Sequence, residues 1–292
     1  MGVEVTNKHH MGMHKKQRIS NTFGYIFLVV MSVIWLIPFV FIVLESFRCE
    51  STWQVGYVWP HDWGLDNYIN LFKETNFGRW YLNTLIIGLA AAVLQTIVVL
   101  SVSYSLSRLR FHGRKMLMNV CLVLGMFPGF ITLIVLYKVL SGLNLTGEHA
   151  VPGLIIIGVA GSGMGYYISK GYFDTIPRSL DEAARIDGAN RFQVFYKVIM
   201  PLAKPIVIYT VLTAFMGPWG DFMFAKYVAH GSSDGMNVAV GLQSLISSPG
   251  NISQYYTMFC AGGVLVAIPI TILFMLLQRY YVEGVTGGAV KG

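Results

Sequence analysis

The chain has 292 residues, of which 54% are apolar and 12% are Asp, Glu, Lys or Arg, about half the charged share of a typical soluble domain. So few charges exclude a surface that faces water on every side, and they predict an all-α membrane protein. The formal net charge of +7 favours nucleic-acid binding only in a soluble protein, so no nucleic acid is expected as a partner.

Six weakly charged stretches are long enough to cross a bilayer, whose hydrocarbon core of about 30 Å needs about 20 helical residues. The predicted spans are residues 19–44, 80–107, 116–137, 149–169, 205–225 and about 256–278. Residues 19–282 therefore form one six-helix transmembrane domain. Residues 1–18 are expected to be a disordered cytoplasmic tail, and residues 283–292 a second cytoplasmic tail.

The distribution of Lys and Arg predicts the orientation of the spans. With both termini on one side, that side carries 16 basic residues and the other side carries five. The positive-inside rule then places both termini and the segment 170–204 in the cytoplasm. The segment 227–254 becomes an extracytoplasmic loop of a multi-pass protein.

The sequence contains no recognisable catalytic or metal-binding motif. No Gly-Lys dipeptide is present, so a phosphate-binding P-loop is absent, and the three cysteines are too scattered to suggest a zinc site. Within the spans, Asp221 is the single acid. We therefore predict no catalytic residue, no metal site and no charge relay, and a transported solute must be driven by energy from another subunit.

The cytoplasmic segment 170–204 is predicted to form a helix, a turn and a second helix. Ser179 and Glu182 have the spacing of a capping box, and Gly188 allows a turn where a side chain would obstruct the chain. Asn190 is a suitable cap for the second helix. In that helix three aromatic side chains are predicted to share one face, namely Phe192, Phe195 and Tyr196. Pro201 is expected to end the helix, and Pro205 is expected to begin the fifth span.

The order Glu182-Ala183-Ala184, then Gly188, then Pro201 resembles the EAA loop of ATP-binding-cassette import permeases. Val198 and Met200 depart mildly from that pattern and keep its apolar character. The resemblance implies that this segment docks into a cleft of an ATPase subunit. The residues expected to couple to the ATPase are Glu182, Ala183, Ala184, Asp187, Gly188, Phe192 and Pro201. Glu182 capping its own helix, with the alanines as simple helix formers, is the alternative.

Further segments resemble the carbohydrate importers within that class, and specifically the branch of the maltose-permease G subunits. The matching segments are residues 77–84, 105–114, 126–128, 170–177 and 283–292. The resemblance implies the fold of type I importer permeases in a bacterial inner membrane. It also implies four protein partners, namely a homologous second permease, two ABC ATPase subunits and an extracytoplasmic solute-binding protein. ATP and Mg²⁺ would be bound by the ATPases, and the substrate would be an oligosaccharide, by default a maltodextrin.

Three further sites are expected with an alternative for each. Trp219 and Asp221 line a substrate path, or else form an interfacial aromatic belt near water. The flexible polar tip Gly231, Ser232, Ser233, Asp234 and Gly235 contacts the binding protein, or is an ordinary connection. The tail 283–292 touches the ATPase, or is disordered. Rival functions are a permease of the same class for another solute, and an ion-coupled carrier that works alone.

Overall fold

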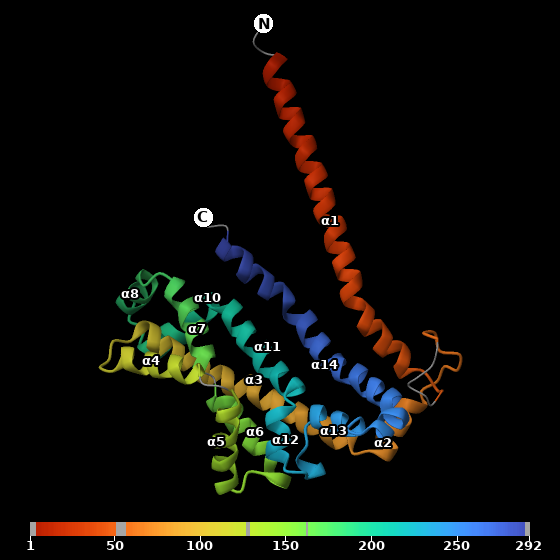
Figure 1. The fold of residues 1–292 in the computed structure, drawn as a ribbon. Coiled ribbons are helices and arrows are strands. Elements are labelled where there is room, and N and C mark those ends of the chain that lie inside the picture. The colour runs from red at the N-terminus through yellow and green to blue at the C-terminus, as the bar shows by residue number, and fades with distance from the viewer. Residues whose placement is uncertain (1–3, 51–56, 127–128, 162, 290–292) are drawn as a thin grey trace.

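The computed structural model describes residues 4–50, 57–126, 129–161 and 163–289, and every regular element in these ranges is a helix (Figure 1). The elements in chain order are α1 (Glu4–Ser46), α2 (Asp66–Glu74), α3 (Phe77–Arg108), α4 (Arg114–Gly125), α5 (Gly129–Gly142), η1 (Gly147–His149), α6 (Ala150–Ala160), α7 (Gly163–Thr175), α8 (Ser179–Ile186), α9 (Arg191–Gln193), the π-helix η2 (Val194–Ile199), α10 (Met200–Leu202), α11 (Lys204–Gly220), α12 (Met223–Ala229), η3 (Ser233–Gly235), α13 (Val238–Leu245) and α14 (Pro249–Ala289).

Four helical segments of the described chain have the length and hydropathy of a membrane span: Asn21–Ser46, Phe77–Arg108, Gly147–Thr175 and Pro249–Arg279. A fifth candidate span is obtained if two helical segments that meet at 83°, Arg191–Leu202 and Lys204–Gly220, are counted as one span. The predicted third span is divided between α4 and α5. The all-helical membrane architecture is confirmed, and the four or five candidate spans of the described residues are consistent with the predicted six without reproducing that number.

Helix α1 stands apart from the rest of the molecule and contacts it mainly through α14, near the end at Ser46 (Figure 1). Between residues 21 and 43 its apolar side chains are exposed. A helix that is apolar on all sides is stable only in lipid or against another protein. The helix begins at Glu4, so the predicted disordered tail is wrong for residues 4–18, and residues 1–3 lie outside the described part of the chain. The residues before the first predicted span contain no proline, so the helix of that span can extend back through them.

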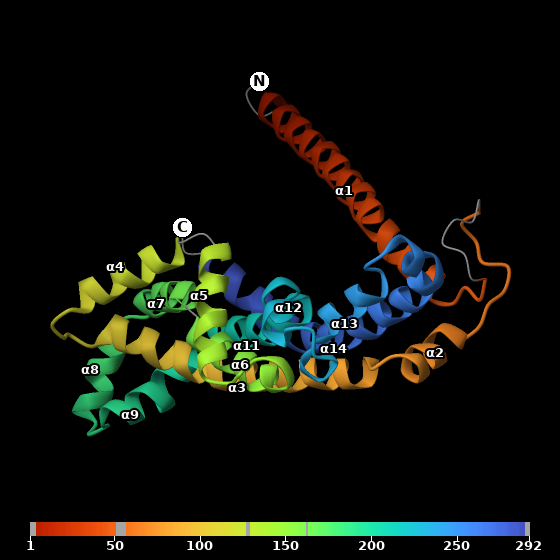
Figure 2. The ribbon, with the colours of Figure 1, turned by 60° about the horizontal axis from the view of Figure 1, so that its bottom comes forward.

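Helix α3 lies along the length of the bundle, from α2 at one end to α8 at the other (Figure 2). It packs against α11, α7 and α6, and it contributes to three separate apolar clusters. Trp80 belongs to the cluster near α2, Ile87 to the middle cluster, and Leu100 and Tyr104 to the cluster near α8. The core of the protein is therefore arranged in three layers along one helix.

Helix α14 begins at Pro249, seven residues before the predicted start near residue 256. The turn-forming residues that favoured a loop in this region include Pro249 itself, and proline is well suited to the first turn of a helix because it needs no N–H partner there. The helix continues to Ala289, so it includes most of the Gly-rich segment predicted as the tail 283–292.

Candidate functional site

The turn after α8 is a Schellman motif, which explains the spacing between Ala184 and Gly188. The N–H of Ala189 donates to the carbonyl of Ala184 at 2.9 Å, and the N–H of Gly188 donates to the carbonyl of Arg185 at 3.0 Å. Gly188 adopts a φ of +85°, which L-residues with a side chain rarely adopt. A Cβ at this position would meet nothing within 4 Å. The glycine is therefore required for its backbone conformation, and the prediction that a side chain would obstruct the turn is wrong.

The two caps predicted from the sequence have different outcomes. Asn190 and Gln193 form a reciprocal capping box, with distances of 2.8 and 2.9 Å, so the cap of the second helix is confirmed. The predicted box between Ser179 and Glu182 is wrong, because α8 begins one residue earlier than that motif requires and its N-cap is Arg178. Glu182 is then a carboxylate in the first turn, where the helix dipole favours negative charge.

The α8–α9 segment presents both acidic and apolar side chains to solvent. Glu182, Ala183 and Asp187 are exposed and Ala184 is half-buried. Ile186 is 86% exposed and Phe192 is 74% exposed, with the Phe192 ring stacked on Tyr196 at 6.4 Å. Exposed apolar side chains of this size, gathered outside the apolar spans, are typical of a surface that binds a partner protein.

The three aromatic residues predicted to share one face are divided between two faces. Phe195 points inward and lies 4.8 Å from the ring of Tyr104, whereas Phe192 and Tyr196 remain exposed. The helical stretch does not end at Pro201, as predicted, but at Leu202, followed by the 83° bend. Because this stretch is widened into π-turns, the Met200 N–H donates to the carbonyl of Phe195, five residues earlier. Pro205 lies in the first turn of α11, as predicted.

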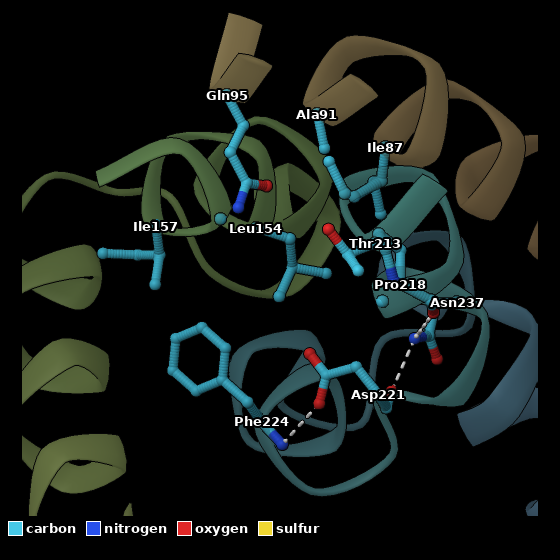
Figure 3. Close-up of a pocket in the computed structure, with 13 residues that line it drawn as sticks. Ile87, Ala91, Gln95, Leu154, Ile157, Thr213, Pro218, Asp221, Phe224 and Asn237 are labelled. Carbon is cyan, nitrogen blue, oxygen red and sulfur yellow. Dashed lines mark hydrogen bonds between the residues drawn. The ribbon is translucent and has the colours of Figure 1, made fainter. Parts of the chain in front are cut away.

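A cavity of about 330 Å³ lies between four of the helices (Figure 3). Its lining is mainly apolar and comes from α3, α6, α11 and α12, with Ile87 and Leu154 among the apolar residues. Polar groups enter it from Gln95, Thr213 and Asp221. Figure 3 shows the Asp221 carboxylate pointing into this space, where one oxygen accepts from the Phe224 N–H at 3.2 Å. An apolar cavity with a few polar groups is typical of a small-molecule path.

Trp219 and Asp221, predicted together as a substrate path, occupy different environments. Trp219 is 4% exposed, belongs to the apolar cluster near α2, and packs edge-on against Tyr81 at 5.2 Å. It does not line the cavity, whereas Asp221 does. Sequence reasoning missed Gln95 and Thr213 as cavity residues, although an amide such as Gln95 inside an apolar span is a detectable signal.

The segment Gly231–Gly235 is held firmly against α3 and is not the flexible tip that was predicted. The backbone oxygen of Ser233 accepts from the Trp80 indole at 3.1 Å, and the backbone oxygen of Asp234 accepts from the Asn83 amide at 2.7 Å. Gly235 is buried, Ser232 and Ser233 are half-buried, and Gly231 and Asp234 are exposed. Contact with a binding protein through the exposed positions stays a prediction.

Comparisons with known proteins agree with this geometry. The family description "binding-protein-dependent transport system inner membrane component" matches residues 97–287. The chain is 38% identical to the maltodextrin transport system permease protein MdxG of Bacillus subtilis, over 92% of this chain and 95% of that protein. It is 35% identical to the maltodextrin transport system permease protein MalD of Streptococcus pneumoniae, over 95% of this chain and 98% of that protein.

The fold is also similar to a solved structure. A chain of a bacterial ABC transporter involved in the import of the acidic polysaccharide alginate superposes with a TM-score of 0.75 and covers 91% of this chain and 98% of its own length. The sequence identity is 23%, so this similarity concerns the arrangement of helices.

Proposed function

Because the chain belongs to the binding-protein-dependent transport inner membrane components, we propose that it is the permease subunit of an ATP-driven oligosaccharide importer. Permeases of this family are non-catalytic membrane subunits. The relatives named for maltodextrin transport make a maltodextrin the default substrate. ATP and Mg²⁺ are expected on two partner ATPase subunits, and this chain is expected to bind no cofactor itself.

The observation that carries the proposal is the exposed α8–α9 segment with its acidic and apolar side chains. A short amphipathic helix of this kind fits a groove on a partner protein. Lys and Arg are concentrated on this side of the chain, which supports a cytoplasmic location, where ATPase subunits bind ATP. Closure of two ATPases around ATP would then move α8 and convert the transmembrane helices between inward-open and outward-open arrangements.

Three other features support the remaining partners and the translocation path. The exposed apolar surface of α1 suits lipid and a homologous second permease, so that each subunit supplies half of the translocation path. The cavity that contains Gln95, Thr213 and Asp221 is the part of that path contributed by this chain. The outer segment 227–254, with Gly231 and Asp234 exposed, is the surface offered to an extracytoplasmic solute-binding protein.

The test is to replace Glu182 by Lys, and in a separate variant Gly188 by Asp, and to measure two quantities. These are co-purification of the ATPase subunits and uptake of radiolabelled maltotriose by cells. Loss of both is expected for Glu182→Lys, because charge reversal opposes docking. A partial reduction of both is expected for Gly188→Asp, because an aspartate adopts the positive φ of this turn less readily than glycine. Normal values of both in both variants would remove the coupling assignment. Uptake by the isolated chain in liposomes without ATPase would instead support an ion-coupled carrier.

A further inference from the structure

The cytoplasmic end of α3 is joined to the segment that contains α8 by a set of buried polar contacts. The Arg108 guanidinium lies 3.2 Å from the Asp181 carboxylate, and the two side chains are 3% and 10% exposed. Arg108 also donates to the carbonyl of Ile176 at 2.8 Å. On the adjacent residue, the backbone oxygen of Ser107 accepts from Arg178 at 3.3 Å, and the Ser107 hydroxyl lies close to Asp174. Asp181 lies directly before Glu182, so these contacts end one residue from the predicted ATPase surface.

The contact between Arg108 and Asp181 depends on charge more than on a directed hydrogen bond. In the described part of the chain, Arg108 Nε and Asp181 Oδ1 have no partner with hydrogen-bond geometry, although Nε lies 3.2 Å from Oδ2. A buried ion pair keeps its partners together because leaving either charge alone is costly. The ion pair, together with the bond from Arg108 to Ile176, therefore holds α8 against the end of α3.

The opposite end of α3 is joined to the outer segment 231–238 in the same way. Asn76 donates to the Ser233 hydroxyl at 2.8 Å, and Asn83 donates to the backbone oxygens of Asp234 and Met236 at 2.7 and 2.8 Å. The N–H of Val238 donates to the Thr84 hydroxyl at 2.7 Å. These bonds span about 150 positions of sequence, so they belong to the tertiary fold and not to local turns.

Helix α3 is the stiff connection between these two ends. It has 32 residues and contains no proline, whereas α1, α11 and α14 each contain a proline in the helix interior. A continuous helix of that length extends for about 48 Å at 1.5 Å per residue. The route along the chain from α8 to α11 instead passes through π-turns and the 83° bend. Displacement of α8 is therefore transmitted outward more directly by α3 than by the backbone that leads from α8 to α11.

We propose that Arg108 is a positioning residue that holds α8 on α3, so that α3 relays movement between the ATPase surface and the outer segment 231–238. The relay works in both directions, because a ligand that favours one position of the outer segment also favours the matching position of α8. Arrival of a loaded binding protein at the outer face thereby changes the ATPase. This inference rests on the proposed function.

The test uses the complete complex of both permeases and two ATPases in nanodiscs. ATP hydrolysis is measured with and without the solute-binding protein, with maltotriose as the probe. For Arg108→Gln and for Asp181→Asn we expect normal assembly and basal hydrolysis, and at least a tenfold loss of stimulation by the binding protein. The exchanged pair Arg108→Asp with Asp181→Arg is expected to recover much of that stimulation. Lys170→Gln is the matched control, because it removes an ion pair with Asp174 whose acid is 40% exposed.

A second variant keeps the test decisive if substitution of the buried pair prevents folding. Asn83→Ala removes two hydrogen bonds at the outer end of α3, far from the ATPase, and is expected to reduce stimulation while assembly is retained. Stimulation within twofold of the wild type in Asn83→Ala, or in an assembled Arg108 variant, would overturn the relay. Failure of the proposed function gives a different result, because Glu182→Lys would then leave ATPase association normal.

Discussion

Substitution of Gly188 measures how far coupling depends on one backbone conformation. At a φ of +85°, an L-residue with a side chain costs about 1–2 kcal/mol relative to glycine. A Cβ at this position would lie more than 4 Å from its surroundings, so no steric term is added. Since 1.4 kcal/mol is tenfold in an equilibrium constant, alanine is expected to lower the population of the observed turn by roughly 5- to 30-fold. Asparagine, which tolerates this region, should cost less, and the β-branched valine should cost more.

The assay for this series is the amount of ATPase subunit that co-purifies with the permease, together with initial rates of maltotriose uptake. The expected order of activity is glycine, asparagine, alanine, valine. Gly171→Ala in α7 is the matched control, because its Cβ also meets nothing within 4 Å and its φ is not positive, so wild-type values are expected. Equal activity across the four residues at position 188 would refute the reasoning, since the helix would then dock without its Schellman turn.

Three further predictions concern stability, the cavity and orientation. Gly241→Ala places a Cβ in steric clash with the Trp80 indole. The resulting overpacking, about 1–3 kcal/mol, should lower the melting temperature in detergent by several degrees. The control Gly250→Ala adds a Cβ in open space and should leave the melting temperature unchanged. Asp221→Asn should leave assembly normal and reduce maltotriose uptake several-fold, and unchanged uptake would remove this carboxylate from the path. Orientation is tested in a chain whose other two cysteines are replaced by alanine. In that chain, Cys49 should react with a membrane-impermeant maleimide added outside the cell. Burial raises the pKa of the Cys49 thiol, so labelling should quicken as the pH rises, and protection at all pH values would contradict the predicted orientation.

The positions of the membrane helices follow from the sequence because hydropathy is a property of each segment alone. The apolar runs at residues 19–44 and 80–107 coincide with parts of α1 and α3, and the sequence also locates Gly188 and Asn190 at the turn after α8. The division of the third span between α4 and α5 is less visible, because proline and glycine are common in transmembrane helices, where they are often tolerated without interruption.

The wrong predictions concern segments in which tertiary packing selects one of two possible local conformations. Ser179 and Glu182 have correct spacing for a capping box, but the guanidinium of Arg178 donates to Ser107 on α3, and the helix begins after Arg178. Similarly, Gly231–Gly235 has the composition of a flexible loop, but side chains from α3, including Asn83, bind its backbone. Neither contact has a signature in the surrounding residues, because both depend on which helix lies alongside.

Helix α3 contacts all three parts of the proposed transport cycle, namely the outer segment, the cavity and the segment that contains α8. Ile87, Ala91 and Gln95 of α3 form part of the cavity wall, and they lie between the outer contacts of Asn83 and the cytoplasmic contact of Arg108. Near the cavity, α3 approaches α11 so closely that a Cβ on Gly88 would lie 3.1 Å from the carbonyl oxygen of Phe215. Polar contacts therefore hold both ends of α3, while its middle packs closely against α11. Displacement of either end must then move the cavity wall against α11, so docking, binding-protein contact and the shape of the path change together.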